Sequence, residues 1–150
     1  MLTYFDKSMN LKIILFVGLG GALGSVSRYC FTLLAQSLSL IQFPWATLSV
    51  NLIGSFVAGM LSQFWLQQSG TLLTQSPLLA ALIANSEFKL FILVGFLGGF
   101  TTFSAFSLDT LILLKNGEAF KAFLFLSAHF VLGVLFCYLG FSTLNEFNKV

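Results

Sequence analysis

Long apolar stretches separated by short polar segments dominate the chain. Four of these stretches are long enough to cross a bilayer as helices, which requires about 20 consecutive apolar residues. They cover residues 11–38, 44–66, 90–114 and 119–144. None of them alternates apolar and polar positions, and an open sheet would leave backbone groups unsatisfied in lipid. The pattern predicts an all-α, multi-pass membrane protein with four transmembrane helices, forming one domain over residues 1–150.

The low charge content supports a membrane location. Charged residues make up 8% of the chain, whereas a soluble domain has about 25%, so lipid must cover most of the surface. The net charge is only +2 and no basic run occurs, which argues against a nucleic-acid partner. The sequence has neither a nucleophile–base–orienter pattern nor metal-ligand spacing, so we do not expect an enzyme.

The lysines that flank the spans give a weak orientation signal. If the spans alternate in direction, four lysines lie on one side of the membrane and two on the other: Lys7, Lys12, Lys89 and Lys149 against Lys115 and Lys121. So small a bias is compatible with insertion in both orientations, or with one poorly encoded orientation that keeps the N-terminus inside. The first apolar run is long enough for a full span, so we expect a retained helix in a bacterial inner membrane rather than a cleaved leader.

The third span contains residues that disfavour a continuous helix. Gly98-Gly99 and Thr101-Thr102 occur in its middle, and these residue types have low helix propensity. A helix broken in the membrane needs protein or a cavity to satisfy its backbone, and freed carbonyls are good ligands for a hard cation such as Na⁺. Phe103 and Phe106 are three residues apart and share a face, although aromatic packing is the ordinary explanation in a chain with 19 phenylalanines.

The first two spans contain polar side chains within their apolar stretches. Arg28 lies inside the first span, where a charge is costly unless it finds a partner, faces a wet vestibule or snorkels to the membrane surface. Thr47, Asn51 and Ser55 are spaced by four in the second span, which places them on one helix face. These side chains either hydrogen-bond to other helices or line a pore.

Further candidate residues lie in the first, third and fourth spans. Gly20 and Gly24 form a GxxxG pair, which favours close helix packing. Asp109 follows the predicted break, and Ser127 and His129 lie in the fourth span. A lone histidine is more often a satisfied packing residue than a ligand, so His129 by itself indicates no particular chemistry.

Three segments in register resemble the CrcB/Fluc-type fluoride channel family. They are GGALGSVSRY at residues 20–29, TLSVNLIGSF at residues 47–56 and GFLGGFTTFSAFS at residues 95–107. The order, the spacing and the four-span layout all match, over about residues 12–143.

The resemblance implies a channel that exports fluoride passively across the cell membrane and relieves fluoride toxicity. It implies an antiparallel, dual-topology homodimer with two pores, or a heterodimer of homologous subunits, and a structural Na⁺ at the dimer centre. The backbone carbonyls of Gly98 and Thr101 would hold the Na⁺. The pore residues would be Asn51, Phe103, Phe106, Thr47, Ser127 and Arg28.

Two other classes fit parts of the pattern. A small multidrug-resistance-like transporter is also a dual-topology four-span protein, but that class needs an acidic residue in its first span. The first span here contains Arg28 and neither Asp nor Glu, which favours anion over cation transport. A membrane scaffold without transport activity would not explain why Arg28, Asn51 and the broken third span occur together in one chain.

Overall fold

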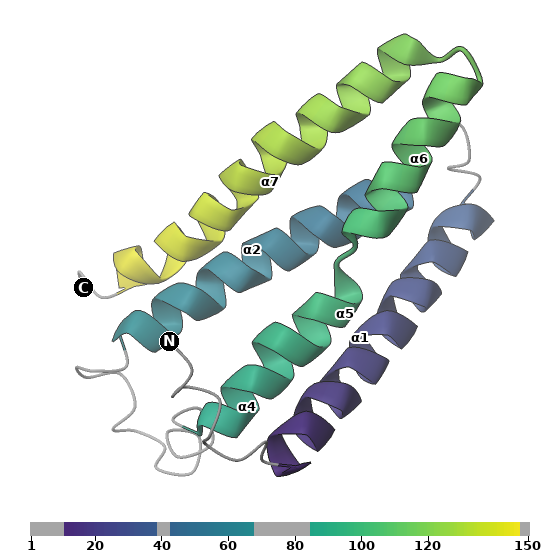
Figure 1. Cartoon of the computed structure of the whole chain (residues 1–150). Coiled ribbons are helices and arrows are strands. Elements are labelled where there is room, and N and C mark those ends of the chain that lie inside the picture. Colours follow the sequence, from purple (N-terminus) through teal and green to yellow (C-terminus); the bar gives the residue numbers. More distant parts are fainter. Residues whose placement is uncertain (1–10, 39–42, 68–84, 148–150) are drawn as a thin grey trace, which may run out of the picture.

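The computed structural model describes residues 11–38, 43–67 and 85–147, and these residues are helical apart from short connections (Figure 1). Four helical segments are long and apolar enough to cross a membrane: Leu11–Ser37, Trp45–Leu66, Ser86–Lys115 and Ala119–Thr143. This confirms the predicted all-helical, four-span architecture. The polar connection expected between the second and third spans falls mostly on residues 68–84, outside the described residues.

Three of the spans are single helices and the third is composite. The single helices are α1 (Leu11–Ser37), α2 (Trp45–Gln67) and α7 (Ala119–Phe147). The third span consists of α4 (Ser86–Leu90), the π-helix η1 (Phe91–Leu97), α5 (Gly98–Phe100) and α6 (Phe103–Lys115).

The interruption of the third span lies at Thr101 and Thr102. Both residues have extended backbone angles, with φ/ψ of −78°/158° and −151°/119°. Thr102 caps the following helix, because its hydroxyl oxygen accepts a hydrogen bond from the backbone N–H of Ala105 at 3.1 Å. Gly98 and Gly99 remain helical, so the chain breaks after the glycine pair and not within it.

The helices pack closely through glycines. A β-carbon at Gly59 of α2 would overlap the carbonyl oxygen of Cys137 on α7, and one at Gly140 of α7 would overlap the carbonyl oxygen of Phe56 on α2. On α1, a β-carbon at Gly24 would overlap the carbonyl oxygen of Phe96 in η1. Small residues therefore bring α2 against α7 and α1 against the third span, as is common between membrane helices.

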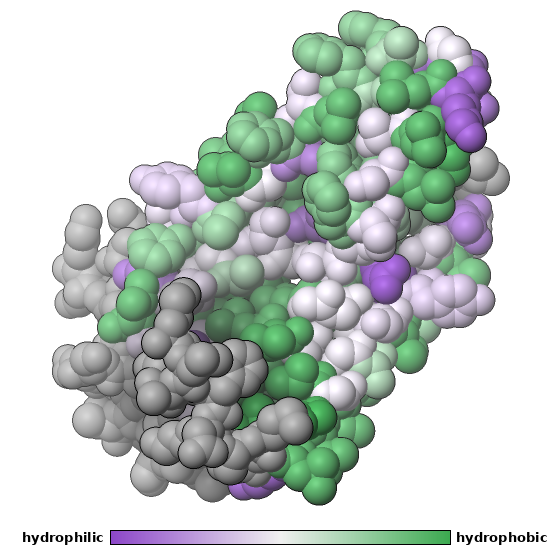
Figure 2. Space-filling model, in the orientation of Figure 1, coloured by the Kyte–Doolittle hydropathy of each residue, from purple (hydrophilic) through white to green (hydrophobic). Residues whose placement is uncertain are grey.

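The buried interior is small and the outer surface is apolar. Leu48, Leu113, Ala122 and Phe125 form a buried cluster at the α6–α7 end of the bundle, and Phe125 is completely buried. Many large apolar side chains are exposed along α1, α6 and α7. Among the residues coloured in Figure 2, apolar and weakly polar ones predominate, and strongly hydrophilic residues form isolated patches. Such a surface suits lipid or another apolar protein surface.

Candidate functional site

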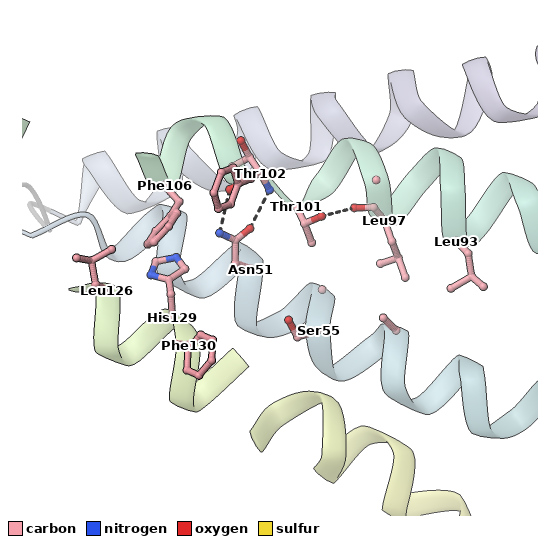
Figure 3. Close-up of a pocket in the computed structure, with 14 residues that line it drawn as sticks. Asn51, Ser55, Leu93, Leu97, Thr101, Thr102, Phe106, Leu126, His129 and Phe130 are labelled. Carbon is pink, nitrogen blue, oxygen red and sulfur yellow. Dashed lines mark hydrogen bonds between the residues drawn. The ribbon is translucent and has the colours of Figure 1, made fainter. Parts of the chain in front are cut away.

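A cavity of about 730 Å³ opens beside the break in the third span (Figure 3). Its walls come from α2, the composite third span and α7. No charged side chain is among the described residues that line it, and the walls are mainly apolar. The residues that bear on its chemistry are Asn51, Thr101, Thr102, Phe103, Phe106 and His129.

The side chain of Asn51 replaces backbone hydrogen bonds that the break removes. Its carboxamide oxygen accepts from the N–H of Thr102 at 2.8 Å, and its nitrogen donates to the carbonyl oxygen of Thr102 at 3.1 Å. These are the dashed lines between α2 and the break in Figure 3. A broken helix within the membrane needs such partners, and Asn51 supplies two of them from the cavity wall.

The break frees the carbonyl oxygens of Gly98 and Thr101. In a continuous helix their donors would be the N–H groups of Thr102 and Ala105, four residues on. Those N–H groups donate instead to the side chains of Asn51 and Thr102. Two backbone oxygens close to the break have thus lost their helical donors, and oxygen atoms are what a hard cation binds.

Arg28 reaches the same segment from α1. Its Nε donates to the carbonyl oxygen of Gly99 at 3.2 Å, and the side chain is partly buried. The arginine therefore has a protein partner inside the bundle, and its charge lies next to the break. Of the three possibilities open from the sequence, the structure favours a paired arginine over one that only snorkels to the membrane surface.

The Thr47 hydroxyl is bound by Asp109. Thr47 does not line the cavity beside the break, which we call the main cavity. Thr47 donates to a carboxylate oxygen of Asp109 at 2.6 Å, joining α2 to α6. Both residues line a second cavity of about 300 Å³, which Gln36, Asn116 and Glu118 make more polar. Thr47 and Asn51 lie one helical turn apart on α2. The second cavity, lined by Thr47, is therefore one turn along α2 from the part of the main cavity that Asn51 lines.

Phe103 and Phe106 differ in their surroundings. Their ring centroids are 5.5 Å apart, and both residues line the main cavity. Phe106 packs against Phe125 and His129, with centroid distances of 5.5 and 4.4 Å. Phe103 is 79% exposed. One ring is therefore fixed by the core, while the other projects from the chain.

The fourth helix contributes His129 to the cavity. The imidazole lies beside Phe106 in a tilted arrangement (Figure 3) and meets Phe125 edge-on, and its Nδ1 lies 3.0 Å from the carbonyl oxygen of Phe125. Ser127, the expected hydroxyl on this helix, is not among the residues that line either cavity described above. The available signal in the sequence was that His129 is an ionisable residue in the middle of a span, a rare position that usually has a role.

Comparisons with known proteins identify relatives of the whole helical region. Residues 15–141 match the family described as "CrcB-like protein, Camphor Resistance (CrcB)". The chain is 44% identical over 131 residues to the fluoride-specific ion channel FluC of Elusimicrobium minutum, covering 87% of this chain and 88% of that protein. It is 39% identical over 132 residues to the FluC of Rhizobium meliloti, covering 88% and 95%. With a FluC of Thermus thermophilus it shares 41% identity over 133 residues, covering 89% and 94%.

Proposed function

Because the chain belongs to the CrcB family, whose curated relatives are named fluoride-specific ion channels, we propose that it conducts fluoride passively across the cell membrane. Its physiological task would be to let fluoride leave the cell and so to relieve fluoride toxicity. The observation that carries this proposal is the cavity beside the break, which brings Asn51, Phe103 and Phe106 together in one apolar wall.

The chemistry of these side chains suits a small, strongly hydrated anion. Conduction requires binding that is strong enough to replace water and weak enough to release the ion. The edge of a phenyl ring is electropositive, so Phe103 and Phe106 offer attraction without a full charge. Asn51 offers N–H donors. Arg28, bonded to the carbonyl of Gly99 at the break, supplies a positive potential that draws anions towards the pore.

A second copy of the chain would complete the pore. Phe103 is 79% exposed, and Ser104 and Ser107 beside it are also exposed, next to a cavity wall that contains Asn51. Polar groups facing lipid are costly, so a protein surface is the better neighbour for this face. We infer an antiparallel, dual-topology homodimer with two pores in the inner membrane, and the weak lysine bias is compatible with that arrangement.

The break also fits a structural Na⁺. The carbonyl oxygens of Gly98 and Thr101 have lost their helical donors, and a β-carbon built on Gly98 would meet no atom within 4 Å, so this side of α5 is open. In the dimer, these two carbonyls and their symmetry mates would hold the ion. A bound Na⁺ would supply positive charge at the centre of the dimer and stabilise both broken helices.

Fluoride efflux from liposomes that contain the purified protein tests the proposed function. A fluoride electrode records release while a potassium ionophore clamps the voltage, and chloride release is measured in parallel. We expect fast fluoride release without chloride release. No fluoride release from folded, dimeric protein would reject the proposal, and cysteine crosslinks that form only between parallel subunits would reject the antiparallel dimer.

A further inference from the structure

The protonation state of the imidazole of His129 follows from its contacts. Its Nδ1 lies 3.0 Å from the carbonyl oxygen of Phe125. A carbonyl oxygen only accepts hydrogen bonds, so Nδ1 must carry a proton and donate. In the neutral ring, Nε2 is then a bare acceptor. This atom is buried and has no hydrogen-bond partner among the described residues.

A proton taken up at Nε2 changes the wall of the cavity in two ways. The bare acceptor becomes an N–H donor, and the ring acquires a full positive charge. The ring lies against Phe106, with 4.4 Å between the two centroids, so the charge appears beside a phenylalanine of the proposed pore. Because Nε2 is buried, it is the positive charge of the ring, and not the new N–H, that attracts an anion in the cavity.

Few other charges surround the ring. On α6, Asp109 acts on it electrostatically, and its carboxylate is bound by the hydroxyl of Thr47. On α2, which has no titratable side chain, the backbone carbonyl of Thr47 faces it. On α7 itself, the nearest charged residue in sequence is Lys121, eight residues earlier, and it is paired with Glu118 at 2.7 Å. The main cavity has no other group that titrates near neutral pH among its lining residues.

We propose that His129 makes the occupancy of the pore by fluoride depend on pH. In acid, the imidazolium on the cavity wall attracts fluoride, and the half-saturating fluoride concentration falls. At higher pH the ring is neutral, and attraction is left to Asn51 and the phenyl edges. This inference rests on the proposed function. His129 is the only histidine in the chain, so it is the one side chain whose ordinary titration falls between about pH 5 and pH 8.

The size of the effect follows from the electrostatics of a partly desolvated site. A unit charge a few ångströms from a bound anion, at an effective dielectric constant of about 20, lowers the binding free energy of the anion. The lowering is large enough to raise its affinity by an order of magnitude or more. The negative charge of Asp109 offsets part of this attraction between the imidazolium and the anion. We therefore expect the half-saturating fluoride concentration to fall on the order of tenfold when the pH is lowered from neutral into the acidic range in which the ring takes up its proton.

Conductance in planar bilayers, measured against fluoride concentration at equal pH on both sides, tests the proposal. Current registers only charged fluoride, so undissociated hydrogen fluoride that leaks through lipid does not contribute. The His129→Gln variant keeps a polar side chain but does not titrate, so its half-saturating concentration should be the same at every pH. In Asp109→Asn, which keeps His129, the pH dependence should persist.

The outcomes separate this proposal from the proposed function. Fluoride current with no pH dependence would overturn the role of His129 and leave the channel standing, whereas no fluoride current at any pH would reject the channel itself. A pH dependence that survives in His129→Gln would assign it to another group and overturn the inference. If His129→Gln fails to fold, NMR of the single histidine in the wild-type protein decides. Its ring titration should shift with fluoride and not with chloride, and an unchanged titration would overturn the inference.

Discussion

The carboxamide of Asn51 and the backbone of Thr102 are joined by two reciprocal hydrogen bonds, of 2.8 and 3.1 Å. The first satisfies the N–H that a continuous helix would have bonded to Gly98, and the second satisfies the carbonyl of Thr102 itself. The amide nitrogen has two N–H groups, so Asn51 can hold the break with one and present the other to an anion. One residue thus serves both the local structure and the pore.

Replacing Asn51 with aspartate tests whether this side chain lies in the path of the anion. Asn51→Asp keeps an acceptor for the N–H of Thr102 but loses the donor and adds a negative charge to the cavity wall. We expect fluoride efflux to fall by more than about tenfold, because like charge repels the ion. Asn51→Ala, which removes both bonds without adding charge, is the matched control. Efflux from Asn51→Asp equal to that of the wild type would exclude Asn51 from the pore.

Exchanging a phenylalanine of the pore for an aliphatic residue removes the electropositive ring edge. Phe103→Ile should reduce fluoride flux by about tenfold or more while the dimer persists in size-exclusion chromatography. Phe106→Ile should do the same, although it also disturbs packing on Phe125 and His129.

Control positions for this experiment lie on α7. Phe120 and Phe123 are 73% and 63% exposed and line neither cavity, so Phe120→Ile and Phe123→Ile should leave the flux near wild type. Equal flux in all four variants would remove the phenylalanines from the mechanism.

The sequence predicted the spans well and the details of the break less well. Hydrophobic length alone defines a span, so the four helices follow from composition. The position of the break does not follow from propensity, because Gly98 and Gly99 are helical although they are poorer helix formers than the threonines. The break lies where Asn51, from another helix, supplies hydrogen bonds.

The sequence also did not reveal which face of the fourth helix is turned toward the cavity. Ser127 was expected in the pore, but His129 lines the cavity. The rotation of α7 depends on its contact with α2, where Gly59 and Gly140 allow the two backbones to meet. The glycines are visible in the sequence, but the identity of their partners is not, because it depends on two segments distant in the chain.

The proposed Na⁺ site can be tested by ion replacement, because its ligands are backbone oxygens that no side-chain substitution removes. We expect the thermal stability of the purified protein to fall, and fluoride efflux to slow, when Na⁺ is replaced by a large organic cation at equal ionic strength. An ion that binds only the folded state stabilises it by mass action, so the melting temperature should rise with Na⁺ concentration. A melting temperature independent of Na⁺ would argue against the site or for an ion that does not exchange, and elemental analysis of washed protein distinguishes these outcomes.

Gly54 on α2 and Thr101 in the break form a contact that a paired substitution can test. A β-carbon at Gly54 would overlap the Cγ2 methyl of Thr101, whose hydroxyl donates to the carbonyl of Leu97 at 2.8 Å. Gly54→Ala should therefore displace the break and reduce fluoride efflux by about tenfold, the size expected when a pore residue is misplaced by a fraction of an ångström.

The second substitution should restore the flux. Thr101→Ser removes the overlapping methyl and keeps the hydroxyl, so the Gly54→Ala/Thr101→Ser double variant should recover most of the lost efflux, with a coupling energy of about 1 kcal/mol or more in a double-mutant cycle. Gly133→Ala is the matched control, because a β-carbon there would meet no atom within 4 Å. If the two substitutions act additively, the conformation at Thr101 does not control conduction, and the break is a packing feature of the bundle.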